Sequence, residues 1–125
     1  MTDEKTPGGA VLAYIGDAVL ELRIREKLIQ TGVTDTGRLS AEAQRLVCAP
    51  AQSECVEKLL PLLTEEEEYI FRLGRNHKTE QKPKHSTVAE YRRATGMEAL
   101  FGWLYLGGNE KRISELFSAA YENFV

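Results

Sequence analysis

The stretch Ala13-Tyr14-Ile15-Gly16-Asp17-Ala18-Val19-Leu20 lies in a helical pattern that extends from Val11 to Ile29. Apolar residues recur across this range mostly at steps of three and four, which is the spacing of a helix that buries one stripe of side chains. Gly32, just beyond, is a helix-stop residue. Asp17 is isolated, because residues 6–16 before it carry no charge. The sequence therefore predicts a long, mainly apolar helix that contains a single conspicuous acid.

The rest of the chain also predicts helices. Two capping boxes, Thr64–Glu67 and Thr87–Glu90, each combine a Thr hydroxyl that accepts from the third backbone N–H with a Glu that reaches back, and each marks a helix start. The second box opens a predicted helix that runs to Leu106. Three further predicted helices span about residues 39–47, 50–61 and 109–124. Residues 74–86 are expected to form a basic loop or a frayed helix end. No alternating strand pattern or internal repeat stands out, so the predicted fold is all-α with about six helices.

The 125 residues suit a single domain, expected to span residues 10–125 behind a flexible N-terminus of residues 1–9. The densest apolar stretch, Ala99–Leu106, is far shorter than the roughly 18 residues that a membrane helix needs. The N-terminus carries acids and lacks the apolar core of a secretory signal, which favours a cytoplasmic protein. Cys48 and Cys55 are then expected to be reduced thiols.

The net charge of −3 conceals an uneven distribution. Between Arg72 and Arg93 there are seven Lys or Arg and two acids, a local net charge of +5, so the rest of the chain carries −8. Such segregation indicates a polyanionic partner that binds one surface in a salt-sensitive way. An ordinary solvated loop and helix face explains the same charges, and charge alone does not choose between the two interpretations.

A second isolated acid is Glu98, the only charged residue between Ala94 and Asn109. A carboxylate beside core side chains is destabilising unless a cation, hydrogen-bond donors or protonation compensates. If two helices cross near Asp17 and Glu98, their carboxylates meet at one spot that a hard divalent cation would neutralise, and Glu21 lies one turn from Asp17. The glycines that would allow such close backbone approach are Gly16, Gly96 and Gly102.

Both acids also have structural interpretations. Thr95-Gly96-Met97-Glu98 is itself a capping box, so Glu98 would cap a helix that begins there. Asp17 would accept from backbone N–H groups if its helix broke at Gly16. Against the first alternative, the helix already has a good start at Thr87, which leaves Thr95 in its interior.

Two segments resemble the motifs of the ribonuclease III catalytic domain. Tyr14–Arg25 resembles the signature helix of that family, and Thr95–Leu106 resembles its second acidic motif, at the expected distance downstream. The resemblance extends over nearly the whole chain and is closest to the short Mini-ribonuclease III branch, which consists of the catalytic domain alone. Supporting segments are Leu73–Lys78, Lys82–Lys84 and Tyr91-Arg92.

The resemblance implies a ribonuclease III-type helical endonuclease domain that cleaves double-stranded RNA with the help of a metal and leaves 5′-phosphates. It implies that Asp17 and Glu98 are catalytic carboxylates that hold Mg²⁺, with Mn²⁺ as a substitute. It implies a homodimer, whose interface the signature helix with Tyr14 and Ile15 would supply. It also implies that the substrate is precursor ribosomal RNA of the 23S type and that a ribosomal protein acts as helper.

The resemblance leaves the other metal ligands open. The larger ribonuclease III enzymes carry further acids at the places that Ala13 and Thr95 occupy here, and Mini-type enzymes are similar to this chain in lacking them. Glu21, Asp35 and Glu42 are the remaining candidates, although Asp35 and Glu42 would equally cap or solvate the second helix.

RNA would be recognised by shape, because A-form RNA hides its major-groove base edges and exposes phosphates and 2′-hydroxyls. The expected RNA-binding residues are Arg75, Lys78, Lys82 and Lys84. The main rival interpretation is a noncatalytic all-α RNA-binding or adaptor protein, which would use the same basic segment without metal chemistry. A zinc site is disfavoured by the spacing of its potential ligands, Cys48, Cys55, His77 and His85.

Overall fold

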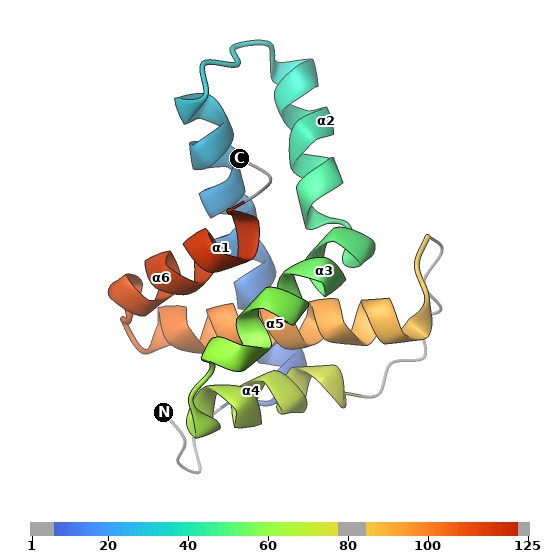
Figure 1. The fold of residues 1–125 in the computed structure, drawn as a ribbon, viewed down its shortest axis with the longest axis vertical. Helices are drawn as coiled ribbons and strands as arrows, with labels where there is room; N and C mark the ends of the chain where they lie inside the picture. Colours follow the sequence, from blue (N-terminus) through green and yellow to red (C-terminus); the bar gives the residue numbers. More distant parts are fainter. Residues whose placement is uncertain (1–6, 78–84, 123–125) are drawn as a thin grey trace.

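The computed structural model describes residues 7–77 and 85–122 (Figure 1). These residues form six α-helices and a short 3₁₀ helix: α1 Gly9–Gln30, α2 Thr36–Val47, α3 Ala49–Leu59, η1 Leu60–Leu62, α4 Glu65–Arg75, α5 Val88–Leu106 and α6 Glu110–Tyr121. No strand occurs among the described residues, so the predicted all-α fold is confirmed. None of these helices is long and apolar enough to cross a membrane.

Both predicted capping boxes are formed. The Thr64 hydroxyl accepts from the Glu67 backbone N–H at 3.1 Å, and the Glu67 carboxylate accepts from the Thr64 N–H at 2.9 Å. Thr87 and Glu90 make the same reciprocal pair at 3.0 and 2.9 Å. These bonds satisfy N–H groups that the first turn of a helix cannot satisfy itself, and they fix where α4 and α5 begin.

Three helix boundaries differ from the sequence-based expectation. α2 begins at Thr36 rather than near Leu39, because the Asp35 carboxylate accepts from the Arg38 N–H at 2.8 Å and caps the helix. α4 continues through Arg75, into the segment predicted as a loop. α6 ends at Tyr121 and Glu122 follows as a turn, while residues 123 and 124 of the predicted last helix lie outside the described residues.

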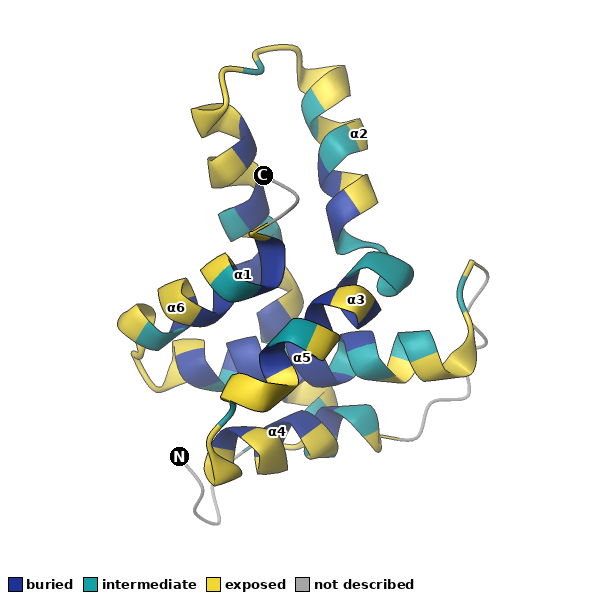
Figure 2. Ribbon diagram, viewed as in Figure 1, coloured by how far each residue is buried: buried dark blue, intermediate teal, exposed yellow. Residues whose placement is uncertain are grey.

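α5 is the centre of the fold. It crosses the middle of the molecule in Figure 1, and α1, α3, α4 and α6 all pack against it. Its buried side chains Met97, Leu100 and Phe101 belong to the main core, which they share with α1, α3 and α6. Figure 2 shows burial concentrated where helices face α5, whereas the arm formed by the end of α1 and by α2 projects from this body and is more exposed. The middle of α5 is therefore a rigid support for any side chain on its surface.

A partly buried ion pair fastens α6 to α4. The Arg112 guanidinium donates to both oxygens of the Glu67 carboxylate at 2.8 Å and also to the backbone carbonyl of Leu62 at 2.8 Å. The Glu67 side chain is buried, although sequence reasoning had assigned it only a capping role. Glu67 therefore caps α4 and orients α6 at the same time.

The two cysteines form no disulfide: Cys48 is half-buried and Cys55 is buried. Burial raises the pKa of the Cys55 thiol to about 11, which keeps it protonated and unreactive. No cluster of three or more His, Cys, Asp or Glu side chains suitable for a metal exists among the described residues, which include both cysteines and both histidines.

Candidate active site at the crossing of α1 and α5

Glycines bring the backbones of α1 and α5 into direct contact. A methyl group on Gly16 would overlap the main-chain carbonyl oxygen of Glu98, and one on Gly102 would overlap the carbonyl oxygen of Leu12. Any side chain at either position would therefore push the helices apart. The crossing places Asp17, the residue after Gly16, beside Glu98.

The end of α4 approaches α5 in the same way. A methyl group on Gly74 would lie 2.6 Å from the Ala99 Cβ and 2.7 Å from the Thr95 carbonyl oxygen, and one on Gly96 would lie 2.7 Å from the ring of Phe71. These distances are too short for a real side chain. Consequently α4 ends against the part of α5 that carries Glu98.

The three helices enclose a cavity of about 240 Å³ that contains both isolated acids. Asp17 reaches it from α1 and Glu98 from α5, so the structure brings the two predicted carboxylates together. Its walls are formed by Ala10, Ala13 and Tyr14 of α1, by Gly74 and His77 at the end of α4, and by Tyr91, Arg92 and Thr95 of α5.

Asp17 is exposed at the mouth of this cavity, whereas Glu98 is half-buried within it. Burial, the charge of Asp17 and a hydrogen bond with Asp17 together raise the pKa of Glu98 to about 9. Within the described residues, neither carboxylate forms an ion pair with Lys, Arg or His. Two neighbouring carboxylates without such a partner form a site that a bound cation would stabilise.

The structural alternatives for these acids are not realised. The Thr95 hydroxyl donates to the Tyr91 carbonyl at 3.0 Å inside α5, so Thr95 is not a helix cap and Glu98 does not complete a capping box. α1 runs without a break past Gly16, so Asp17 is not at a helix start. Both acids are left for another use.

Two carboxylates fit a Mg²⁺ ion, because this ion keeps several waters and is usually held by one or two carboxylates together with substrate phosphates. The structure does not bring Glu21, Asp35 or Glu42 to the cavity. Glu21 pairs with Arg25 at 3.1 Å, Asp35 caps α2, and Glu42 pairs with its neighbour on the same helix at 2.9 Å. Asp17 and Glu98 are thus the carboxylates that could hold a metal here.

Of the four predicted RNA-binding residues, the structure describes Arg75. Arg75 lies half-buried at the end of α4, near the cavity but not lining it, with its guanidinium 5.9 Å from the centre of the Phe71 ring. Lys78, Lys82 and Lys84 lie outside the described residues. They remain predictions.

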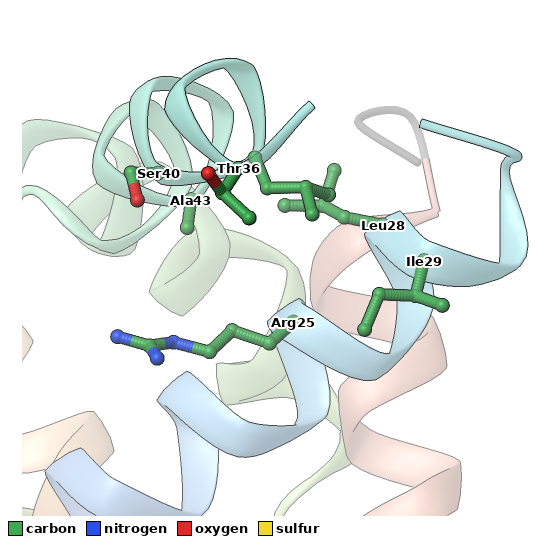
Figure 3. Close-up of a pocket in the computed structure, with 7 residues that line it drawn as sticks. Arg25, Leu28, Ile29, Thr36, Ser40 and Ala43 are labelled. Atoms are coloured by element: carbon green, nitrogen blue, oxygen red, sulfur yellow. The ribbon is translucent and has the colours of Figure 1, made fainter. Parts of the chain in front are cut away.

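A different cavity, in the arm, carries no comparable chemistry. It lies between the end of α1 and α2, has a volume of about 240 Å³, and is drawn in Figure 3. Its lining contains no acid, histidine or cysteine; the residues are Arg25, Leu28, Ile29, Thr36, Leu39, Ser40 and Ala43. The cavity with Asp17 and Glu98 is therefore the candidate active site.

Comparison with known proteins identifies the family of the chain. The Ribonuclease III domain matches residues 10–109, which is most of the chain. The chain belongs to the ribonuclease III family. A Mini-ribonuclease 3 from Symbiobacterium thermophilum is 45% identical over 109 residues, which cover 87% of this chain and 84% of the relative. A Mini-ribonuclease 3 from Enterococcus faecalis is 40% identical over 120 residues, which cover 94% of this chain and 91% of the relative.

A solved structure supports the fold of this ribonuclease III-type chain. The crystal structure of a protein from Fusobacterium nucleatum superposes with a TM-score of 0.88 at 31% identity and covers 98% of this chain and 100% of that one. Together with the relatives above, it confirms the resemblance to the Mini-ribonuclease III branch and the helical endonuclease fold. Family membership makes the chain an endoribonuclease of the ribonuclease III type.

The places of the missing family acids also lie in the cavity. Ala13 and Thr95, where the larger ribonuclease III enzymes were expected to carry further carboxylates, both line it.

Sequence reasoning had not connected three lining residues with the acids: His77, Tyr91 and Arg92. Tyr91 lies seven residues before Glu98, which is two helical turns, so its spacing was a usable signal. Arg92 lies six residues before Glu98, about 120° away around the helix, so spacing did not mark it. No comparable local signal existed for His77, which reaches the cavity through the packing of α4 on α5.

Proposed function

We propose that this chain is a magnesium-dependent endoribonuclease that hydrolyses phosphodiester bonds of double-stranded RNA and leaves 5′-phosphates. The observation that carries the proposal is the convergence of Asp17 and Glu98 in one cavity, where neither forms an ion pair with a described cationic side chain. Mg²⁺ held by these two carboxylates would supply charge stabilisation and Lewis-acid chemistry for attack on phosphorus, and Mn²⁺ is expected to substitute.

The residues of the chain have mainly a positioning role in this proposal. α1 and α5 are locked at their glycine crossing, so Asp17 and Glu98 are held without rearrangement when the substrate arrives. Arg75 and the basic segment beyond it would bind backbone phosphates, because duplex RNA exposes its phosphates and 2′-hydroxyls. Lys78, Lys82 and Lys84 belong to this proposed RNA-binding segment.

We further propose a homodimer with one site per subunit, since two antiparallel strands are cut equivalently by two-fold symmetry. An apolar face of α1, defined by Val11, Tyr14, Ile15, Ala18 and Leu22, supports this proposal, because Tyr14 is 83% exposed and Leu22 is 60% exposed. Tyr14 also lines the carboxylate cavity, so the face borders the site. Precursor ribosomal RNA as substrate, a ribosomal protein as helper and a cytoplasmic location are further parts of the proposal, and they rest on the resemblance to the Mini-ribonuclease III branch.

The test is cleavage of structured RNA with and without Mg²⁺. Wild type is expected to cut duplex RNA only with the metal, while Asp17→Asn and Glu98→Gln fold and bind RNA but lose at least about 10³-fold in rate, as is typical when transition-state charge stabilisation is removed. Glu54→Gln, an exposed acid on α3, is the matched control and should cut like wild type. Binding without any cleavage by wild type would instead support a noncatalytic RNA-binding or adaptor protein.

A further inference from the structure

Arg92 lies between two hollows on the surface of α4 and α5. On one side it lines the cavity with Asp17 and Glu98. On the other side it lines a groove of about 530 Å³, whose polar lining consists of Arg75, Asn76, Arg92 and Arg93. Among the described residues Arg92 is the one that lines both, so its side chain borders the path between the cavity and the groove.

The charge on Arg92 has no counter-ion in the described part of the chain. Arg93, its neighbour, pairs with Glu57 at 2.6 Å, and Arg72 pairs with Glu68 at 2.9 Å. Arg92 forms no ion pair with a described acid, not even with Asp17 or Glu98 across the cavity. The Arg92 side chain is exposed, so its guanidinium is available to a ligand from solution.

Arg75 extends this cationic path along the groove. Its guanidinium likewise pairs with no described carboxylate; it donates to the Asn76 side chain at 3.2 Å and lies over Phe71. The surface thus carries Asp17 and Glu98 in the cavity, Arg92 at its border with the groove, and Arg75 in the groove. This order matches a phosphodiester strand whose reacting phosphate lies at the acids and whose neighbouring phosphates lie at the arginines.

We propose that Arg92 binds the phosphate adjacent to the scissile one and thereby sets the register of the cut strand, with the groove toward Arg75 accepting the strand's continuation. The inference rests on the proposed nuclease function and adds a positioning residue to it. A guanidinium suits this role because it binds phosphate through two parallel N–H groups, which fixes orientation as well as position.

The test is an interference scan under metal-free conditions, so that binding is measured without cleavage. A short RNA duplex is prepared in versions that each carry one uncharged methylphosphonate in place of a phosphate, and dissociation constants are measured for wild type, Arg92→Ala, Arg92→Lys and Arg38→Ala. Arg38 is an exposed arginine on α2, also without a described acid as partner, and serves as the matched control.

Arg92→Ala is expected to weaken binding of the unmodified duplex about tenfold, in the range of one charge-assisted hydrogen-bonded contact. One methylphosphonate position should weaken wild type by about the same factor yet leave Arg92→Ala changed by less than about twofold, because the contact is already gone. Arg92→Lys should recover part of the affinity, and Arg38→Ala should stay within about twofold of wild type. With Mg²⁺ present, the position identified by the scan should lie next to the cut.

Equal losses from Arg92→Ala and Arg38→Ala would overturn the inference, as would a scan in which every methylphosphonate affects wild type and Arg92→Ala alike. If wild type cuts duplex RNA but no methylphosphonate position is coupled to Arg92, the nuclease function is supported and the inference about Arg92 is wrong. A wild type that never cuts overturns the nuclease function, and with it the inference, whatever the scan shows.

Discussion

At the residue scale, Glu98, a proposed metal ligand, lies where its ionised form lowers the stability of the fold. Its pKa is raised from 4.5 to about 9 by burial and by Asp17, so the native state disfavours the ionised carboxylate that the unfolded chain has at neutral pH. The stabilising effect of the protonated group is fully present below the unfolded pKa of 4.5 and is lost as the pH rises toward 9. Without a cation the site therefore opposes folding at neutral pH.

Glu98→Gln should consequently stabilise the metal-free protein at neutral to mildly alkaline pH. The expected gain is about 1–2 kcal/mol, in the range found when a buried charge is replaced by a neutral group of similar volume. Thermal unfolding in a chelator would show a higher Tm for the variant, and the difference should vanish in acid. Mg²⁺ should raise the Tm of wild type but not of Glu98→Gln, since a ligand stabilises only the state that binds it. A lower Tm for the variant in the chelator would contradict this account.

The pKa of Glu67 is shifted in the opposite direction to that of Glu98. Burial by itself would raise its pKa, but hydrogen bonds from Arg112 and from the Thr64 backbone outweigh burial and hold the pKa of Glu67 below 4.5. Its ion pair therefore stabilises the fold above the unfolded pKa, and this stabilisation is lost as the pH falls through the lower native value.

Glu67→Gln should cost roughly 2–4 kcal/mol at neutral pH, because it leaves the partly buried Arg112 without its partner. Urea unfolding at a series of pH values would show this cost shrinking as the solution is acidified below 4.5. Glu68→Gln, which removes an exposed ion pair with Arg72, is the control and should cost no more than about 0.5 kcal/mol.

At the scale of elements, the decisive feature is the contact of α1 and α5 at Gly16 and Gly102. Glycine normally weakens a helix interior, yet here it allows two backbones to touch, so it is required by packing and not by the helix. The same contact sets the separation of Asp17 and Glu98. Stability and the geometry of the site therefore depend on the same atoms.

Gly16→Ala should lower the free energy of unfolding by about 3 kcal/mol, despite the better helix propensity of alanine, because the new methyl group overlaps the Glu98 carbonyl oxygen. Variants that still fold should lose RNA cleavage, since α1 and α5 are pushed apart. Gly37→Ala, in the exposed first turn of α2, meets only the Asp35 side chain and should change stability by less than about 1 kcal/mol. Chemical denaturation of both variants is the measurement, and equal effects would refute the special role of the crossing.

At the scale of the whole molecule, the apolar face of α1 is a surface that a single copy of the chain leaves in water. Ile15, Ala18 and Leu22 line a hollow there together with Tyr105 from the end of α5. Exposed apolar side chains that cluster in this way mark association sites more often than isolated ones do. The face borders the carboxylate cavity at Tyr14, so assembly and catalysis would be linked.

Leu22→Glu should convert the proposed dimer into a monomer, because a carboxylate within an apolar interface loses hydration without gaining a partner. Sedimentation velocity would show the change in mass, and cleavage of duplex RNA should fall with it. Leu62→Glu places the same charge on an exposed apolar residue of η1 and should leave the oligomeric state unchanged. A wild type that is monomeric at all concentrations would refute the dimer.

The amino-acid sequence by itself determined the helical fold, the starts of α4 and α5, and the two acids worth examining, because capping and apolar periodicity depend on residues within one or two turns of each other. It also marked the glycines at which the helices could meet. The tertiary structure decided that α1 and α5 do cross there, that Glu21, Asp35 and Glu42 lie elsewhere, and that His77 and Arg92 share the cavity. It likewise joined Glu67 to Arg112 across 45 residues. Such contacts depend on how whole helices pack, and no local pattern in the chain specifies that packing.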